Sequence, residues 1–142
     1  MPATVTLASL LTDVSKRLES LNNPHPKSGM GRFLENMANP DTRVYAFQWA
    51  ESAIAEAVER NEYENFKAGL EFRIKQILEG KEGKTEESAI ATLIEYYKRD
   101  VMNQATRTSR STSSLSNLVD DHTLAVKAKI LQVLEGDFLA SF

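Results

Sequence analysis

The chain has 142 residues and a mass of 15.9 kDa, a size typical of a single domain. Its 17 Lys and Arg residues and 20 Asp and Glu residues give a formal net charge of −3, which removes any general electrostatic attraction to nucleic acids and anionic membranes. Cysteine is absent, so disulfide bonds, thiol nucleophiles and Cys-ligated zinc are excluded. No apolar run is long enough for a secretory signal or a membrane-spanning helix. We therefore expect one soluble, intracellular domain over residues 1–142, cytoplasmic by default.

The first predicted helix covers residues 5–21. The prolines of the following segment, Pro24 and Pro26, end it because proline lacks the backbone donor that a helix needs. A short helix over residues 32–38 comes next. The apolar residues of the first helix recur at intervals of three and four, as on one face of an α-helix: Leu7, Leu10, Leu11, Val14, Leu18 and Leu21.

The segment Asn39-Pro40-Asp41 is a strong helix start, because it combines a capping side chain, a proline at the first helical position and an acid that the helix dipole favours. We expect this helix to cover residues 39–60. Tyr45 and Trp49 lie on nearly the opposite side from its main apolar face. That face consists of Phe47, Ala50, Ile54, Ala57 and Val58.

Asn61 followed by Glu64 resembles a capping box, so the sequence predicts a separate helix over residues 62–79. Gly80 suits the left-handed position after its end, and Phe72 lies opposite its apolar stripe. Thr85 caps a further helix over residues 86–104. The stripe of the first of these two helices contains Tyr63, Phe66, Leu70, Ile74, Ile77 and Leu78, and that of the second contains Ile90, Leu93, Ile94, Tyr97 and Val101.

Residues 106–116 are almost all Ser, Thr or Arg, which predicts a mobile loop because little in them can be buried. The last helix covers residues 118–135, stops at Gly136 and leaves a short tail over residues 137–142. No segment alternates as a strand does. We predict an all-α fold, a compact antiparallel bundle of five long helices plus one short helix. The stripe of the last helix contains Val119, Val126, Ile130, Val133 and Leu134.

Several apolar residues lie away from the face that each helix should bury, and two interpretations remain open for them. They pack inside the chain, or they form a surface for self-association or a protein partner, for which Tyr and Trp are favoured. We favour the second interpretation for the last helix and its tail. The candidate partner interface is Leu124, Leu131, Phe138, Phe142, Tyr45, Trp49 and Phe72.

Residues with catalytic potential form no convincing arrangement. His25 and His122 are the only histidines, and Asp120, Asp121 and His122 follow one another in directions that do not converge on one ion. We therefore expect no enzymatic activity, cofactor or metal. A locally basic segment offers possible phosphate contacts through Lys98, Arg99, Arg107 and Arg110.

The sequence thus predicts a non-enzymatic protein–protein interaction module: an adaptor, regulatory or structural subunit of a larger assembly that self-associates as a homo-oligomer. One alternative is a small helical nucleic-acid-binding regulator that uses the basic segment over residues 98–110. This alternative is disfavoured because the segment is small and lacks aromatic residues among its charges. Another alternative is a helical ligand-binding pocket lined by Tyr45, Trp49, Tyr97 or Met102, whose small molecule is unknown.

Overall fold

The computed structural model describes residues 5–21, 34–105 and 114–142, except for the side chains of residues 105, 114, 115 and 138. All the elements in these ranges are helical, without a strand among them, which confirms the all-α prediction. A short helix over residues 34–38 precedes the longest one. The elements are α1 (Leu7–Leu21), α3 (Arg43–Leu78), α4 (Glu86–Ala105), α5 (Ser114–Leu134) and a 3₁₀ turn, η1 (Phe138–Ala140).

The prediction of five long helices is wrong, because the two helices predicted over residues 39–60 and 62–79 are replaced by one, α3. α3 continues for 36 residues through Asn61, which makes it about 54 Å long at 1.5 Å per residue. The predicted break had a physical basis. The apolar residues before Asn61, such as Ile54, lie on roughly the opposite side of the helix from those after it, such as Leu70. No proline or glycine interrupts residues 43–68, so the helix continues although its apolar face changes side.

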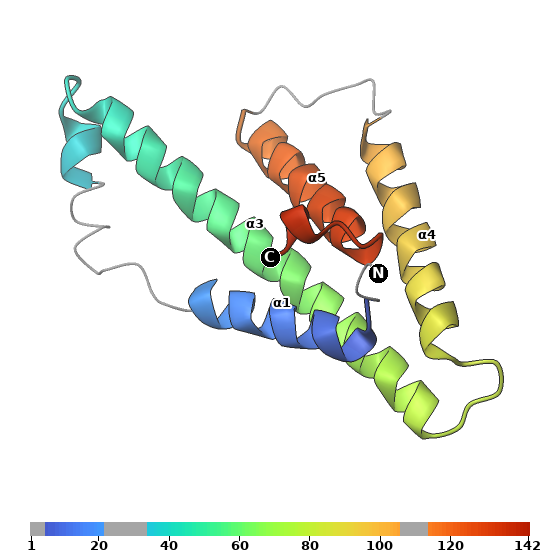
Figure 1. The fold of residues 1–142 in the computed structure, drawn as a ribbon. Coiled ribbons are helices and arrows are strands. Elements are labelled where there is room, and N and C mark those ends of the chain that lie inside the picture. The colour runs from blue at the N-terminus through green and yellow to red at the C-terminus, as the bar shows by residue number, and fades with distance from the viewer. Residues whose placement is uncertain (1–4, 22–33, 106–113) are drawn as a thin grey trace.

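α1 begins with a reciprocal capping box and lies across α3 (Figure 1). The backbone N–H of Ser9 donates to Thr6 Oγ1 at 3.0 Å, and that of Thr6 donates to Ser9 Oγ at 3.1 Å. The N–H of Leu7 donates to Glu86 Oε1 at 2.8 Å, which ties the start of α1 to the start of α4. An ion pair of 2.8 Å between Arg17 and Glu59 joins α1 to α3.

α5 packs against both α3 and α4, whereas α3 and α4 touch each other little. The core lies where α1, α5 and the C-terminal half of α3 meet α4. It consists of Leu7, Leu10, Val14, Leu18, Leu21, Tyr63, Phe66, Leu70, Ala89, Leu93, Tyr97, Ile130, Val133 and Leu134.

The C-terminal ends of α3 and α5 and the start of α4 follow the sequence signals. Gly80 and Gly136 adopt φ of 68° and 91°, the left-handed conformation that lets a helix close its last carbonyls. Thr85 caps α4 as predicted, because its Oγ1 accepts a hydrogen bond of 3.1 Å from the N–H of Ser88. The predicted loop over residues 106–116 is too long at its end, since α5 already begins at Ser114. Its residues 106–113 lie outside the described part of the chain.

Candidate functional site

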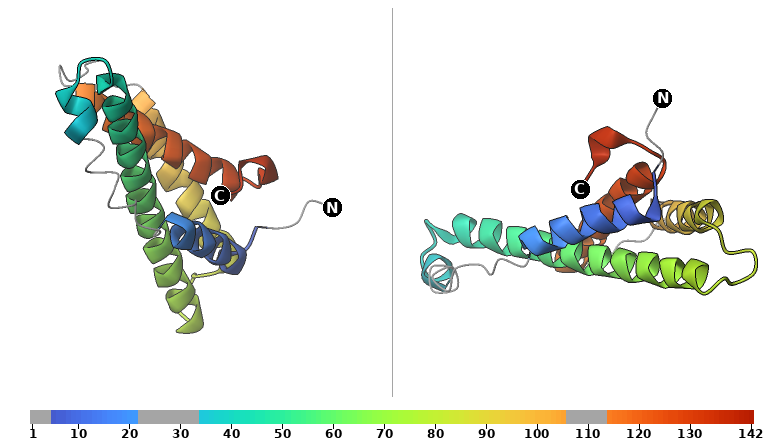
Figure 2. Two further views of the ribbon diagram at one scale, coloured as in Figure 1. Left: turned by 90° about the vertical axis from the view of Figure 1, so that its left-hand side faces the viewer. Right: turned by 60° about the horizontal axis from the view of Figure 1, so that its bottom comes forward.

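The N-terminal end of α3 combines apolar composition with exposure. In Figures 1 and 2 this end extends past both α1 and α5. Arg43 and Gln48 are the polar residues of segment 43–50, yet Ala46 alone is buried there. We call the large exposed side chains the α3 end patch: Leu34 (61% exposed), Val44 (52%), Tyr45 (58%) and Phe47 (58%).

Hydrogen bonds hold the short helix of residues 34–38 against this end of α3. Thr42 Oγ1 donates to the carbonyl oxygen of Asn36 at 3.2 Å, and Arg43 Nε donates to that of Met37 at 3.3 Å. The Asn39 side chain accepts a bond of 3.0 Å from the N–H of Asp41, as expected for a turn that leads into a helix. The helix itself begins at Arg43, later than the predicted start at residue 39.

The predicted interface residues of the last helix and tail lie largely within the chain. Leu131 and Phe142 pack against the core. The Phe142 ring meets that of Tyr63 edge-on at a centroid distance of 5.0 Å and that of Phe66 at 5.9 Å. Leu124 is half-buried, and the side chain of Phe138 lies outside the described part of the structure.

The predicted interface residues of α3 divide differently. Tyr45 and Phe72 are exposed at opposite ends of the helix, and Trp49 is half-buried one turn after Tyr45. Phe47 was expected in the core, together with Ala50 and Ile54, but the structure exposes it. Sequence periodicity missed it because the apolar face that contains Phe47 is not the face that the C-terminal half of α3 buries.

The possible phosphate contacts are only partly visible. Lys98 and Arg99 are exposed on α4. Arg107 and Arg110 lie outside the described residues, so the structure brings no cluster of the four together. Among the residues that are described, no three His, Cys, Asp or Glu side chains are placed to hold a metal ion.

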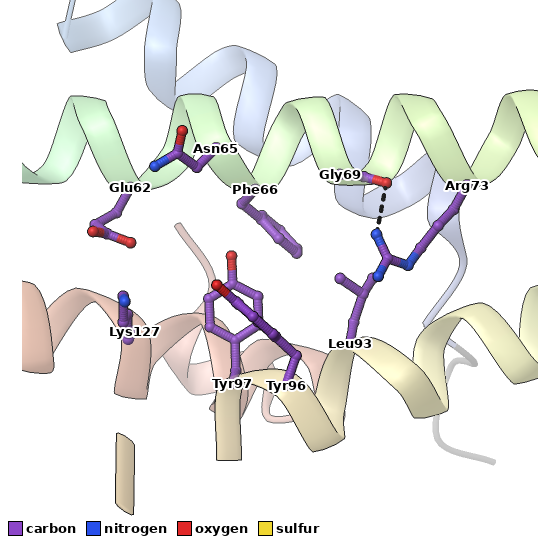
Figure 3. A pocket seen from close by; sticks show the side chains of 9 residues that line it. All are labelled: Glu62, Asn65, Phe66, Gly69, Arg73, Leu93, Tyr96, Tyr97 and Lys127. Atoms are coloured by element: carbon purple, nitrogen blue, oxygen red, sulfur yellow. Dashed lines mark hydrogen bonds between the residues drawn. The ribbon is translucent and has the colours of Figure 1, made fainter. Parts of the chain in front are cut away.

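A pocket of about 250 Å³ lies between α3 and α4 and reaches α5 (Figure 3). Its position follows from the fold, because α5 holds α3 and α4 apart while contacting both. Tyr97, one of the residues proposed for a ligand pocket, lies in it, whereas Tyr45, Trp49 and Met102 do not. The lining residues are Glu62, Asn65, Phe66, Gly69, Arg73, Leu93, Tyr96, Tyr97 and Lys127.

Charged groups occupy both ends of this pocket. Glu62, at 8% exposure, and Lys127 lie at one end, and the Arg73 guanidinium lies at the other, where it donates to the carbonyl oxygen of Gly69 at 3.1 Å. Burial raises the pKa of the Glu62 carboxyl; the charge of Lys127 opposes this shift and that of Asp100 adds to it. Burial, and secondarily the charge of Glu62, also raises the pKa of the Tyr97 hydroxyl.

Although Lys127 faces Glu62 in Figure 3, the bonded partner of its ammonium group is Asp100. Lys127 and Asp100 form a hydrogen-bonded ion pair between α5 and α4. Burial alone lowers the pKa of Lys127, but the bond to Asp100 and the charge of Glu62 outweigh it and raise the pKa. Among the described residues, the Glu62 carboxylate therefore has no ion pair of its own.

Comparison of the sequence with protein-family models finds no match, and neither characterised proteins nor solved structures match it. Within the described ranges, no helix has both the length and the apolar character needed to cross a membrane.

Proposed function

We propose that this protein is a non-enzymatic interaction module that self-associates through the α3 end patch. The observation that carries the proposal is the contrast between composition and burial in residues 43–50. A helical segment that is apolar on most of its sides normally lies inside a protein, because water contact with that surface is unfavourable. In this chain, Val44, Tyr45 and Phe47 instead remain exposed at the end of the longest helix.

A second copy of the chain is the occupant that we propose for the α3 end patch. Two copies related by a two-fold axis place the same patch on both sides of one interface, so each supplies the apolar surface that the other lacks. Val44 and Phe47 are three positions apart and lie side by side on one face of α3. Tyr45 lies on nearly the opposite side of α3 from Phe47, so it extends the exposed apolar surface around the helix, and it is of a residue type favoured at interfaces. Such pairing suits an adaptor or a structural subunit of a larger assembly.

Light scattering after size exclusion, over a wide range of concentration, tests this proposal. We expect the wild-type chain to form a dimer. The substitutions Phe47→Glu and Tyr45→Glu should each raise its dissociation constant at least about tenfold, because truncating a central aromatic residue commonly costs more than 1.4 kcal/mol of binding. Helix content should not change, since neither side chain belongs to the core.

The matched control is Gln132→Glu, which adds the same negative charge at an exposed position of α5. It should leave the dimer intact. A chain that is monomeric at every concentration would contradict self-association. An oligomer that is indifferent to both Phe47→Glu and Tyr45→Glu would place the interface elsewhere and contradict the role of the α3 end patch.

A further inference from the structure

The pocket between α3 and α4 contains a buried acid without a hydrogen-bonding or ion-pair partner of its own. Glu62 is more than nine-tenths buried, and Figure 3 shows its carboxylate directed into the pocket. Lys127 points toward the same region but forms its ion pair with Asp100. A largely buried carboxylate without a hydrogen-bonded partner is costly, because it loses part of its hydration and the charge of Lys127 offsets this loss only in part. No described residue donates a hydrogen bond to the Glu62 carboxylate, although Asn65, Tyr97 and Lys127 line the same pocket.

The charges around Glu62 determine which donor fits. At this end of the pocket, Asp100 and Lys127 cancel each other, which leaves the negative charge of Glu62 in excess. The Arg73 guanidinium is remote. Its hydrogen-bond acceptor, the carbonyl oxygen of Gly69, lies seven residues along α3 from Glu62, a rise of about 10 Å. One additional positive charge beside Glu62 would complete the local balance.

The rest of the pocket wall is largely aromatic, with Asn65 and Arg73 as its polar members. The rings of Phe66, Tyr96 and Tyr97 line it together with Leu93. The rings of Phe66 and Tyr97 meet edge-on at 5.8 Å, and those of Tyr96 and Tyr97 at 5.3 Å. Aromatic faces attract ammonium groups within about 6 Å of the ring centre, and apolar walls accept the carbon body of a ligand. The volume of about 250 Å³ lies just below the usual range of about 300–1,000 Å³, which suits a small ligand.

We propose that this pocket binds a primary amine on a short apolar or aromatic body, with Glu62 accepting hydrogen bonds from its ammonium group. Phe66, Tyr96 and Tyr97 hold the body. The amine supplies a hydrogen-bond donor and a positive charge for Glu62 alone, which Lys127 does not provide because it is paired with Asp100. The same chemistry occurs in free small amines and in the side chain of a partner protein's lysine. The proposal is independent of self-association, because the pocket and the α3 end patch share no residue.

Isothermal titration with phenethylamine and with phenethyl alcohol tests the proposal. The two probes have the same aromatic body and differ in the ammonium group. We expect saturable binding of the amine, and binding of the alcohol weaker by at least about tenfold, because charge-assisted hydrogen bonds are roughly twice as strong as neutral ones. N-α-acetyl-lysine methylamide, titrated in parallel, identifies the source of the amine. Tighter binding than phenethylamine indicates a lysine side chain, and weaker binding indicates a free small molecule.

Variants then locate the bound amine. Glu62→Gln should weaken phenethylamine binding as much as loss of the ammonium group does, whereas Glu64→Gln, an exposed position two residues along α3, should not change it. Tyr96→Ala removes a largely exposed ring, so the chain should still fold while binding weakens several-fold. Equal binding of amine and alcohol, indifference to Glu62→Gln, or no saturable binding of phenethylamine or the lysine derivative would each overturn the proposal.

Discussion

Glu62 makes the stability of the fold depend on pH. Burial raises its carboxyl pKa above the ordinary value of 4.5, so the folded chain binds this proton more tightly than the unfolded chain does. The free energy of unfolding therefore falls as the pH rises through the interval between the two pKa values, and it stays lower above that interval. Glu62→Gln cannot ionise and escapes this loss. We expect it to stabilise the ligand-free protein at pH 7 by about 1 kcal/mol.

Urea denaturation at two pH values measures this effect. At pH 4, where Glu62 is largely protonated in both states, wild type and Glu62→Gln should have nearly equal free energies of unfolding. The difference should open as the pH rises to 7. Glu64→Gln changes an exposed carboxylate on the same helix, so its free energy of unfolding should differ little from that of wild type, and this difference should not grow with pH. If the difference in free energy of unfolding between Glu62→Gln and wild type is the same at pH 7 as at pH 4, burial does not disfavour the ionised carboxylate.

At the scale of the element, glycine has opposite roles at two positions. Gly136 closes α5 at φ 91°, where an L side chain is strained by about 1 kcal/mol although a Cβ would meet no neighbouring atom. Gly69 lies inside α3, and its Cβ would meet only the Arg73 side chain, at 3.4 Å. Thermal denaturation should therefore show Gly136→Ala destabilised by about 1 kcal/mol and Gly69→Ala stabilised by about 0.5–1 kcal/mol. Equal effects of the two substitutions would contradict a conformational origin.

Local signals in the sequence predicted most of the helices and their ends. Thr85 forms the cap predicted for it, and the glycines after α3 and α5 have the expected left-handed backbone. Asn61 misled the prediction, because its capping pattern coincides with a change in the apolar face of α3. A cap is worth about 1 kcal/mol and a mid-helix Asn costs less than that, so neither decides whether a helix stops. Whether the helix continues depends on the elements that pack against it, and the periodicity of the sequence does not identify these.

At the scale of the whole molecule, the sequence identified surplus apolar residues but not which of them are covered. Phe142 and Leu131 find partners in the core, while Phe47, expected there, is exposed. The pocket was equally hard to foresee, because it depends on α5 keeping α3 and α4 apart. Tyr97 was named for it, but Glu62 was not. Tertiary packing determines which apolar side chains stay exposed, and helical periodicity identifies only the residues that could be.

The two phenylalanines therefore predict opposite consequences of substitution. Phe142→Ala removes a ring that meets Tyr63 and Phe66 edge-on, and we expect it to lower the free energy of unfolding by about 2–3 kcal/mol. Phe47→Glu removes a ring that is 58% exposed, so it should change the stability of the monomer by less than about 0.5 kcal/mol while weakening the dimer.

Denaturation and light scattering on both variants separate these roles. At a protein concentration low enough for monomer, Phe142→Ala alone should unfold earlier. At high concentration Phe142→Ala should still dimerise and Phe47→Glu should not, because binding of a second copy stabilises only a chain that keeps the α3 end patch. If Phe142→Ala abolishes the dimer and leaves the monomer as stable as wild type, the tail is the interface. The α3 end patch would then be an exposed surface without that role.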